Sequence, residues 1–421
     1  MSAAPSLLVI AYDRFEPFRV DVRVLFAREL VARGYRIDWL LQSERDCDRD
    51  YVVPWGGGQA WVGRTDNGRS RLARVRKHLL AIANELRVFW LLRKRRYDCV
   101  IVKDEFIAPL FALVAARLAG VPFYYWLSYP FPEESLWLAR QGRARYPVLY
   151  TIRGHLFRFL LYRIILPASR HVLVQSEQMK RDVIAAGIPA DKLTPVLMGV
   201  DLARVPYSDP GGVPAMGRTQ PPAIVYLGTL IRVRHLEFLM RAFARVRRDV
   251  PDARLVMIGD GDDPSDRALL VAEAEQCGVA EAVEFTGFMP MEDAWQRVAE
   301  AAVCVSPIHP SPVLNAGSPT KLIEYMAMGK AVVANDHPEQ RQVIAASGGG
   351  LCVPWDEAEF AAATVQLLRD PGLAADMGRR GRRYVEQARD YRVIAREVDE
   401  MFRARLTGFA QGRPANARPA T

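Results

Sequence analysis

The sequence predicts an α/β protein built from two Rossmann-like domains. Short apolar runs, partly β-branched, alternate with amphipathic helical patterns along the 421 residues, which is typical of parallel sheets covered by helices. A segment rich in proline and glycine, 206–222, separates two such regions and predicts a linker. Because half of the composition is apolar, a chain of this length can bury a core in each domain.

The first domain is predicted over 1–205. Its strands are expected at 7–11, 37–41, 99–102, 123–127 and 171–174, with a helix at 106–119 before Gly120. The segment 51–67 is rich in glycine and tryptophan and has no clear period, so we expect it to be a loop. The second domain is predicted over 223–388, followed by a helix over 389–406. Residues 407–421 predict a disordered tail.

Charge is unevenly distributed along the chain. The formal net charge is +9, segment 140–170 has seven arginines and no acidic residue, and 69–96 contains only one acid, Glu85. This pattern predicts an anionic membrane surface as partner, and it favours nucleic acid less. The five cysteines have no zinc spacing, and the N-terminus lacks the basic start of a signal peptide. The sequence therefore predicts a cytoplasmic protein, bound peripherally at the inner face of the cytoplasmic membrane.

Two basic segments each have two interpretations. In 156–166 an apolar stripe at helical spacing is flanked by Arg158 and Arg163. Such a helix either lies in a membrane interface or packs into the core, because both show the same period. Segment 69–96 either contacts anionic lipid electrostatically or forms a solvated face. The stripe of 156–166 consists of Phe157, Leu160, Leu161, Ile164 and Ile165.

A strand–helix–strand unit is predicted over 302–335. Its strands fall at 302–306 and 331–335, Ser318 is expected to cap the helix between them, and Gly329 to end it. Helical spacing places Thr320, Lys321 and Glu324 on one face. A hydroxyl, a cation and a carboxylate at a helix start suit a phosphate together with a diol. The alternative is an ordinary helix with a Lys321–Glu324 ion pair.

A second group of cations follows the predicted strand 223–227. The turn GTLIRVRH, residues 228–235, contains Arg232 and Arg234 and precedes a helix. Cations at this position would stabilise the charge that develops on a diphosphate leaving group. The alternative is a pair of exposed arginines before a helix.

The run SPTKLIEYMAMGKAVVAN, residues 318–335, resembles the donor-site motif of the retaining family 4 glycosyltransferases, which have the GT-B fold. The turn GTLIRVRH resembles the GRLxxxKG loop of that family, with Thr229 in the arginine place and Arg234 in the lysine place. LMGVD, which contains Met198, resembles its NGVD turn. The commoner donor motif has a glutamate where this chain has Ala316.

The resemblance implies two Rossmann-like domains that face each other across a cleft, with the helix 389–406 crossing back to the first. It implies transfer of a sugar from a UDP- or GDP-sugar with retained configuration, and neither metal nor cofactor. Retention without an enzymic nucleophile suggests that the departing phosphate accepts the acceptor's proton. The basic helices further suggest that the acceptor lies at a membrane, for example a glycan linked to polyprenyl diphosphate. The alternatives are a nucleotide-sugar epimerase and a catalytically silent scaffold at the membrane.

The motif matches and the strand-end positions together predict the site. Glu324 is expected to bind the nucleotide ribose, because the resemblance places it on the family's ribose-binding glutamate. Asp104 follows the predicted strand in VIVKDEF and is the candidate base. The predicted catalytic residues are Arg232, Arg234, Lys321 and Asp104. The predicted substrate-binding residues are Glu324, Ser318, Thr320, Gly228, Thr229 and Gly317.

Overall fold

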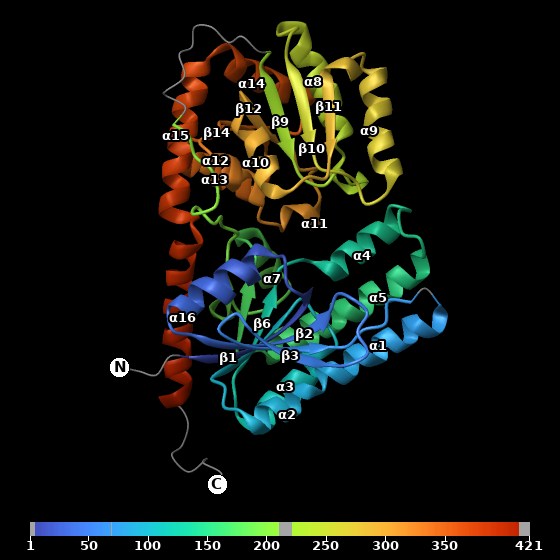
Figure 1. The fold of residues 1–421 in the computed structure, drawn as a ribbon, viewed down its shortest axis with the longest axis vertical. Coiled ribbons are helices and arrows are strands. Elements are labelled where there is room, and N and C mark those ends of the chain that lie inside the picture. The colour runs from blue at the N-terminus through green and yellow to red at the C-terminus, as the bar shows by residue number, and fades with distance from the viewer. Residues whose placement is uncertain (1–4, 69, 210–220, 412–421) are drawn as a thin grey trace. The chain divides into compact units, whose positions relative to one another are not determined.

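The computed structural model describes residues 5–68, 70–209 and 221–411 (Figure 1). The chain divides into an N-terminal unit, residues 1–197 and 391–421, and a C-terminal unit, residues 198–390. Each unit is a largely parallel sheet with helices packed against it, which confirms the predicted fold class. Residues 210–220 of the predicted linker and 412–421 of the predicted tail lie outside the described residues.

The N-terminal unit contains an eight-stranded sheet in the order β3-β4-β2-β1-β5-β6-β7-β8. Strand β1 pairs in parallel with β2 on one side and β5 on the other, so the order of the sheet reverses there. Ligands of such sheets bind beside the carboxyl ends of the strands at this reversal. The strands are β1 (Ser6–Phe15), β2 (Arg36–Ser43), β3 (Tyr51–Trp55), β4 (Gly58–Gly63), β5 (Cys99–Lys103), β6 (Phe123–Leu127), β7 (His171–Val174) and β8 (Leu193–Pro195).

Helices cover both faces of this sheet. The π-helical segment η1 and the last helix, α16, pack together on one face, where Phe402 contacts the ring of Tyr124. Helix α3 packs on β5 and β6, and α1 on β2 and β4. The helical segments are η1 (Asp21–Leu30), α1 (Arg71–Glu85), α2 (Arg87–Lys94), α3 (Ala108–Ala119), α4 (Phe131–Arg140), α5 (Pro147–Phe159), η2 (Leu160–Ile165), α6 (Leu166–Ala168), α7 (Glu177–Ala185), η3 (Ala190–Lys192) and α16 (Tyr391–Gln411).

The structure corrects the expected loop at 51–67. Strands β3 and β4 form an antiparallel hairpin there, joined by Gly56 and Gly57, which both have positive φ angles. Two consecutive residues of positive φ match the tight turn that connects twisted strands. Pro54 is tolerated because β3 is an edge strand. Two strand-like runs separated by Gly56–Gly57 therefore predict a β-hairpin.

The structure also decides between the two interpretations of 156–166. Leu161 and Ile165 are fully buried in η2, and Phe157 stacks on Phe106 at 4.6 Å between ring centroids. The predicted stripe therefore faces mainly the core, although Ile164 is partly exposed. The side of α5 that is exposed is not the side that carries the predicted stripe. At the other end of the unit, α16 continues through 407–411, which had been predicted as part of the tail. None of the helices in the described ranges is long and apolar enough to cross a membrane.

The C-terminal unit contains a six-stranded sheet in the order β11-β10-β9-β12-β13-β14. Its order reverses between β9 and β12, which pair in parallel. The strands are β9 (Ala223–Leu227), β10 (Arg254–Ile258), β11 (Val283–Gly287), β12 (Val303–Ser306), β13 (Val332–Asn335) and β14 (Gly350–Val353). The two strands predicted around the central helix are thus β12 and β13, which are neighbours in the sheet.

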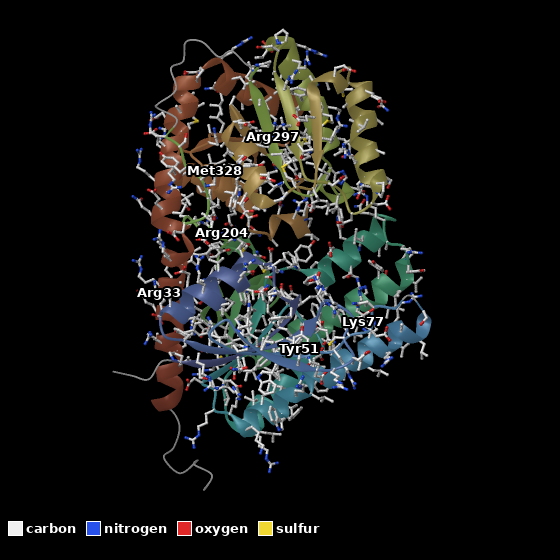
Figure 2. All side chains as sticks on the ribbon, in the orientation of Figure 1. Arg33, Tyr51, Lys77, Arg204, Arg297 and Met328 are labelled. Carbon is white, nitrogen blue, oxygen red and sulfur yellow. The ribbon has the colours of Figure 1, made fainter. Side chains whose placement is uncertain are left out.

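Two hydrophobic clusters bury the two faces of this sheet. Phe243 of α8 and Phe360 of α14 belong to one, and Leu322 of α12 and Val343 of α13 to the other. Arg204, labelled in Figure 2, pairs with Glu292 at the start of α10. The helical segments are η5 (Arg232–Arg234), α8 (Glu237–Asp249), α9 (Pro264–Gln276), η6 (Ala280–Ala282), α10 (Met291–Ala299), α11 (Pro312–Asn315), α12 (Thr320–Ala327), α13 (Pro338–Ser347), α14 (Glu357–Arg369) and α15 (Pro371–Ala388).

Candidate functional site

The predicted site residues of the C-terminal unit lie in two loops at the reversal of its sheet. One loop follows β9 and the other runs from β12 through α11 to α12. Gly228 directly follows β9 with φ +148°, and its N–H donates to the carbonyl of Ile258 at 2.9 Å. A Cβ atom on Gly259 would lie 2.2 Å from the Gly228 carbonyl oxygen. Only glycine at 259 permits this close approach of the two strand ends.

The loop after β9 directs its two arginines differently. Arg234 is partly buried, and its Nε donates to Thr229 Oγ1 at 2.8 Å. Arg232 is 54% exposed; its guanidinium pairs with Asp266 at 3.3 Å and donates to Ser265 Oγ at 2.9 Å. Both partners belong to α9. Arg234 is therefore fixed beside the predicted substrate-binding residue Thr229, whereas Arg232 is engaged by a neighbouring helix.

Lys321, on the first turn of α12, carries a buried ammonium group. Its Nζ has no hydrogen-bond partner among the described residues and lies 3.9 Å from the centroid of the Tyr226 ring. It would lie 3.1 Å from a Cβ atom on Gly228, so it faces the end of β9. Burial, together with the charge of Arg234, lowers the pKa of this ammonium well below its usual value. A buried cation that has no hydrogen-bond acceptor is complementary to an anion, because a bound anion would compensate its charge.

Glu324 follows Lys321 by about one helical turn. Burial raises the pKa of its carboxyl group to about 7, and the charge of Lys321 opposes that shift. No ion pair joins the two side chains within the described residues. The alternative of an ordinary helix with a Lys321–Glu324 ion pair is therefore not what the structure shows, because Lys321 is buried and turned toward Tyr226.

Tyrosine side chains attach α12 to the strand ends. The hydroxyl of Tyr325 accepts a hydrogen bond from the Leu227 N–H at 2.6 Å, and Tyr325 is completely buried. The hydroxyl of Tyr226 donates to the Thr229 carbonyl at 3.3 Å. These contacts hold Lys321 and the loop after β9 together.

Ser318 does not cap α12, contrary to our expectation. The position before the helix is Pro319, and no side chain in the described part of the chain caps it. The Ser318 hydroxyl instead donates to Glu339 Oε1 at 2.6 Å and accepts from the Met198 N–H at 3.1 Å. Glu339 also accepts from Arg389 at 2.9 Å, and Arg389 donates to the Met198 carbonyl. This buried ring of contacts fixes the start of α12 and leaves its first N–H groups without a side-chain cap.

The last residue of β13 and the residues after it hold the loop that precedes α12. Asn335 bonds the N–H and carbonyl of Ile308 through its side-chain amide. His337 Nδ1 accepts from the Glu339 N–H, so its Nε2 carries the proton and donates to the Leu314 carbonyl at 3.0 Å. Burial lowers the pKa of His337 to about 4, which keeps the ring neutral. These positioning residues were not predicted from the sequence, although the run NDHPEQ starts where β13 ends.

Gly317, Thr320 and Thr229 complete the predicted set in this unit. Thr320 is the first residue of α12, and Gly317 precedes Ser318 in the connection from α11; both are partly exposed. Ala316, which stands where the commoner motif has a glutamate, is buried. The structure therefore brings Gly228, Thr229, Arg234, Lys321 and Glu324 to one end of the sheet.

Asp104 belongs to the N-terminal unit, where it lies at the reversal of that sheet. It is buried, with φ +56°, and follows β5. One carboxylate oxygen accepts from the Ser128 N–H at 2.7 Å; the other accepts from the Ser128 hydroxyl and contacts Lys103 at 3.3 Å and Arg19 at 3.5 Å. Both oxygens of Asp104 are thus already occupied.

Two further aspartates surround the same cations and were missed in the sequence. Lys103 contacts Asp21 at 3.3 Å and Asp13 at 3.8 Å. Burial raises the pKa of Asp13, with Lys103 and Arg19 opposing. Burial acts in the same direction on Asp21, but there Lys103 and Arg19 outweigh it and lower the pKa. Asp13 is therefore the carboxyl group of this cluster that holds a proton more readily than usual.

Sequence profiles of two families match the two halves of the chain. The profile described as "Glycosyltransferase Family 4" matches residues 24–204, and that described as "Glycosyl transferases group 1" matches residues 221–370. The chain belongs to glycosyltransferase family 4. In this family 4 glycosyltransferase, the second match contains the loop after β9 and all of α12.

Individual relatives of this family 4 glycosyltransferase have diverse printed activities. A glycogen synthase of Mycobacterium tuberculosis is 25% identical over 230 residues, which cover 53% of this chain and 51% of that protein. A GDP-mannose-dependent alpha-(1-6)-phosphatidylinositol monomannoside mannosyltransferase of Mycolicibacterium smegmatis is 29% identical over 286 residues, which cover 64% of this chain and 72% of that protein. The chain thus spans about half the length of the first of these relatives.

The fold of this family 4 glycosyltransferase is GT-B. A sucrose-phosphate synthase of Thermosynechococcus elongatus superposes with a TM-score of 0.73 at 18% identity, covering 96% of this chain and all of that one. At this identity the likeness concerns the fold alone.

Proposed function

We propose that this protein transfers a sugar from a nucleoside diphosphate sugar to an acceptor. The observation that carries the proposal is the buried ammonium of Lys321, which has no hydrogen-bond acceptor in the described chain and whose pKa the charge of Arg234 helps to lower. Two preorganised positive charges at the strand ends suit a diphosphate, whose negative charge grows as the glycosidic bond breaks. Glu324, one turn along α12, would accept hydrogen bonds from the two ribose hydroxyls.

Gly228 and Thr229 complete the proposed diphosphate site. Gly228 leaves room beside Lys321, since a side chain there would approach its Nζ. Thr229 orients the Arg234 guanidinium. Gly317, Ser318 and Thr320 precede or begin α12, so the proposal includes the free N–H groups of this helix start as further donors to phosphate.

The proposal includes transfer with retained configuration and without a metal. Arg234 and Lys321 would stabilise the leaving diphosphate. The bond from the anomeric carbon to the diphosphate oxygen breaks, and the bond to the acceptor oxygen forms on the same face. The acceptor's proton then passes to the departing diphosphate. Asp104 remains our candidate residue for the acceptor site. Because both of its carboxylate oxygens already contact Ser128 or Lys103, we favour a positioning role over proton transfer.

The proposed acceptor is a lipid-linked saccharide at a membrane. The relative described above as a phosphatidylinositol monomannoside mannosyltransferase supports a lipid-borne acceptor. A second support is the exposed α5 stripe, which we define as Val148, Leu149, Ile152, Leu156 and Phe159. These side chains are between 50% and 73% exposed, and the helical repeat places them within about 100° of each other on one side of α5.

Charge at the ends of the α5 stripe favours an anionic membrane. Arg145 precedes α5, Arg163 lies in η2 directly after it, and both are exposed. No acidic residue occurs between Glu134 and Glu177. Helix α1 shows a similar exposed set in Leu72, Val75 and Leu79, and its Lys77, labelled in Figure 2, bonds Asn67. Apolar side chains edged by arginine suit a peripheral helix in the headgroup region.

A binding panel tests the donor assignment. UDP- and GDP-sugars are titrated into the protein and into Arg234→Gln and Arg232→Gln variants. We expect Arg234→Gln to weaken binding about tenfold or more, as loss of a charge-assisted hydrogen bond does. Arg232→Gln should change it by less than about threefold, because an exposed ion pair already holds Arg232. Equal losses in both variants, or binding that neither affects, would contradict this arrangement.

A further inference from the structure

A cavity of about 800 Å³ lies in the N-terminal unit, away from its candidate residues. It is lined by the second half of α3, the residues at the starts of β6, β7 and β8, and α16. Asp104 and Ser128 lie instead beyond the carboxyl ends of β5 and β6. Five residues of β6 separate the two edges, which amounts to about 16 Å of extended chain. The cavity is therefore distinct from the proposed acceptor side.

The cavity wall is strongly basic. It contains Arg117, Arg170, Lys192 and Arg405 against one carboxylate, Asp191, so the formal charge of the lining is 4 − 1 = +3. Lys192 Nζ donates to the Pro167 carbonyl and Arg405 to the Asp191 backbone carbonyl, both at 2.9 Å. Neutral carbonyls orient these two cations without cancelling their charge. A cavity of this size with convergent polar groups has the dimensions of a small-molecule site.

Tyr124 adds an aromatic ring and a hydroxyl group to the cavity lining. Its side chain is completely buried and lines the cavity. Its ring is fixed by stacking on Phe402, with 5.9 Å between ring centroids. Burial raises the pKa of Tyr124, with Arg405 and Arg170 opposing. With its pKa raised in this way, the hydroxyl stays protonated and can serve as a hydrogen-bond donor.

We propose that this cavity binds a phosphate ester whose organic part is apolar or aromatic. Arg170 and Arg405 would bind the phosphate, because guanidinium groups match its geometry and hold it bidentately. Tyr124 would donate to one of its oxygens, and Leu113, Val114 and Phe123 supply an apolar wall for the remainder. The ester comes either from a soluble metabolite or from a phospholipid headgroup.

Calorimetric titration of the full chain with phenyl phosphate tests the site. We expect a single phenyl phosphate to bind outside the nucleotide site, so Lys321→Met should leave its affinity unchanged. The double variant Arg170→Gln/Arg405→Gln should weaken it at least tenfold. Arg93→Gln, an equal loss of charge at an exposed position on α2, is the matched control and should leave it unchanged. Tyr124→Phe keeps the ring, removes only the hydroxyl and should weaken binding severalfold, so the test does not depend on whether the double variant folds.

Dihexanoyl phosphatidylglycerol, titrated below its micelle concentration, distinguishes the two sources. Tighter binding of this lipid than of phenyl phosphate, lost in the same variants, supports a headgroup; the reverse order supports a soluble ester. The proposal is overturned if Tyr124→Phe and the double variant both bind phenyl phosphate as the wild type does. It is equally overturned if Lys321→Met alone abolishes the binding.

Discussion

The ammonium of Lys321 lies 3.9 Å from the centroid of the Tyr226 ring and has no hydrogen-bond acceptor among the described residues. The aromatic face compensates part of the cost of burying this charge. Arg234 adds a second positive charge, which lowers the pKa of Lys321 further. The C-terminal unit thus holds two cations whose unfavourable burial and mutual repulsion a bound anion would offset. The first two predictions follow from this.

Replacing the buried ammonium should stabilise the ligand-free protein while weakening donor binding. At about pH 6, where Glu324 is largely protonated because its pKa is about 7, Lys321→Met removes a costly buried charge and should raise the free energy of unfolding by about 1 kcal/mol. Because the pKa of Lys321 is lowered in the folded state, the unfolded state binds more protons between that pKa and the usual value. Wild-type stability should therefore rise with pH in that window, and the gain in Lys321→Met should shrink. Urea unfolding at several pH values measures both effects; a variant less stable than wild type at about pH 6 would contradict the account.

Binding of a nucleoside diphosphate should be coupled to proton uptake by Lys321. A nearby diphosphate raises the pKa of the ammonium, so affinity should fall as pH rises through the alkaline range. At about pH 9 the carboxyl group of Glu324 is ionised before and after binding, since its pKa is about 7, and Lys321 dominates the exchange. Titration calorimetry in two buffers of different ionisation enthalpy should show uptake of up to about one proton. Lys321→Arg, which stays charged, is the control and should abolish the buffer dependence; equal heats in both buffers for wild type would disagree with the coupling.

The buried contacts around Ser318 should matter for stability and for donor affinity. Arg389→Met leaves the Glu339 carboxylate buried without its cation, and should cost about 3–5 kcal/mol. Ser318→Ala removes one hydrogen bond at each of two partners and should cost about 1–3 kcal/mol. Arg341→Met breaks an ion pair of similar type with Asp336, whose side chains are 62% and 48% exposed, and should cost less than about 1 kcal/mol.

Denaturant unfolding measures these three variants, and nucleotide titration shows whether the start of α12 has moved. The account requires Arg389→Met and Ser318→Ala to weaken nucleotide binding as well as stability. If Arg341→Met destabilised the protein as much as Arg389→Met, burial would not be the deciding factor.

The α5 stripe should contribute to binding of anionic vesicles. Ile152→Glu places a carboxylate in the exposed stripe and should lower partitioning onto phosphatidylglycerol vesicles about tenfold or more, since both apolar contact and charge are affected. Thr151→Glu makes the same change of charge at the adjacent exposed residue, which lies off the stripe, and should have a smaller effect. Vesicle pelleting measures both. Equal effects of the two variants would mean that charge alone matters, and no effect of either would remove α5 from the membrane surface.

Much of the fold could be predicted from sequence because its signals are local. The strands that became β9, β12 and β13 are short apolar runs ended by turn residues, and their order alone predicts parallel pairing. The hairpin of β3 and β4 was missed although Gly56–Gly57 is a local turn signal. The stripe of 156–166 could not be assigned to core or surface, since a helix that faces a sheet and one that faces lipid have the same period.

Those features of the candidate site that depend on helical spacing could be predicted from the sequence. Those that depend on hydrogen bonds to residues far away in the chain could not. Helical spacing placed Lys321 and Glu324 a turn apart on α12, but not the burial that leaves the ammonium without an acceptor. The role of Ser318 depends on Met198 and Glu339, which lie 120 and 21 residues away, and they take the hydroxyl that would otherwise cap the helix. Arg232 and Arg234 look equivalent in sequence; Asp266 on α9 distinguishes them.

The central claim is that the buried ammonium of Lys321 receives the diphosphate of the donor. A crystal structure with a bound nucleoside diphosphate tests it most directly. The account predicts a diphosphate oxygen within about 2.7–3.2 Å of Lys321 Nζ, with Arg234 on the same diphosphate and a ribose hydroxyl bonded to Glu324. A nucleotide bound elsewhere, with Lys321 Nζ still packed on Tyr226 and without an acceptor, would contradict it.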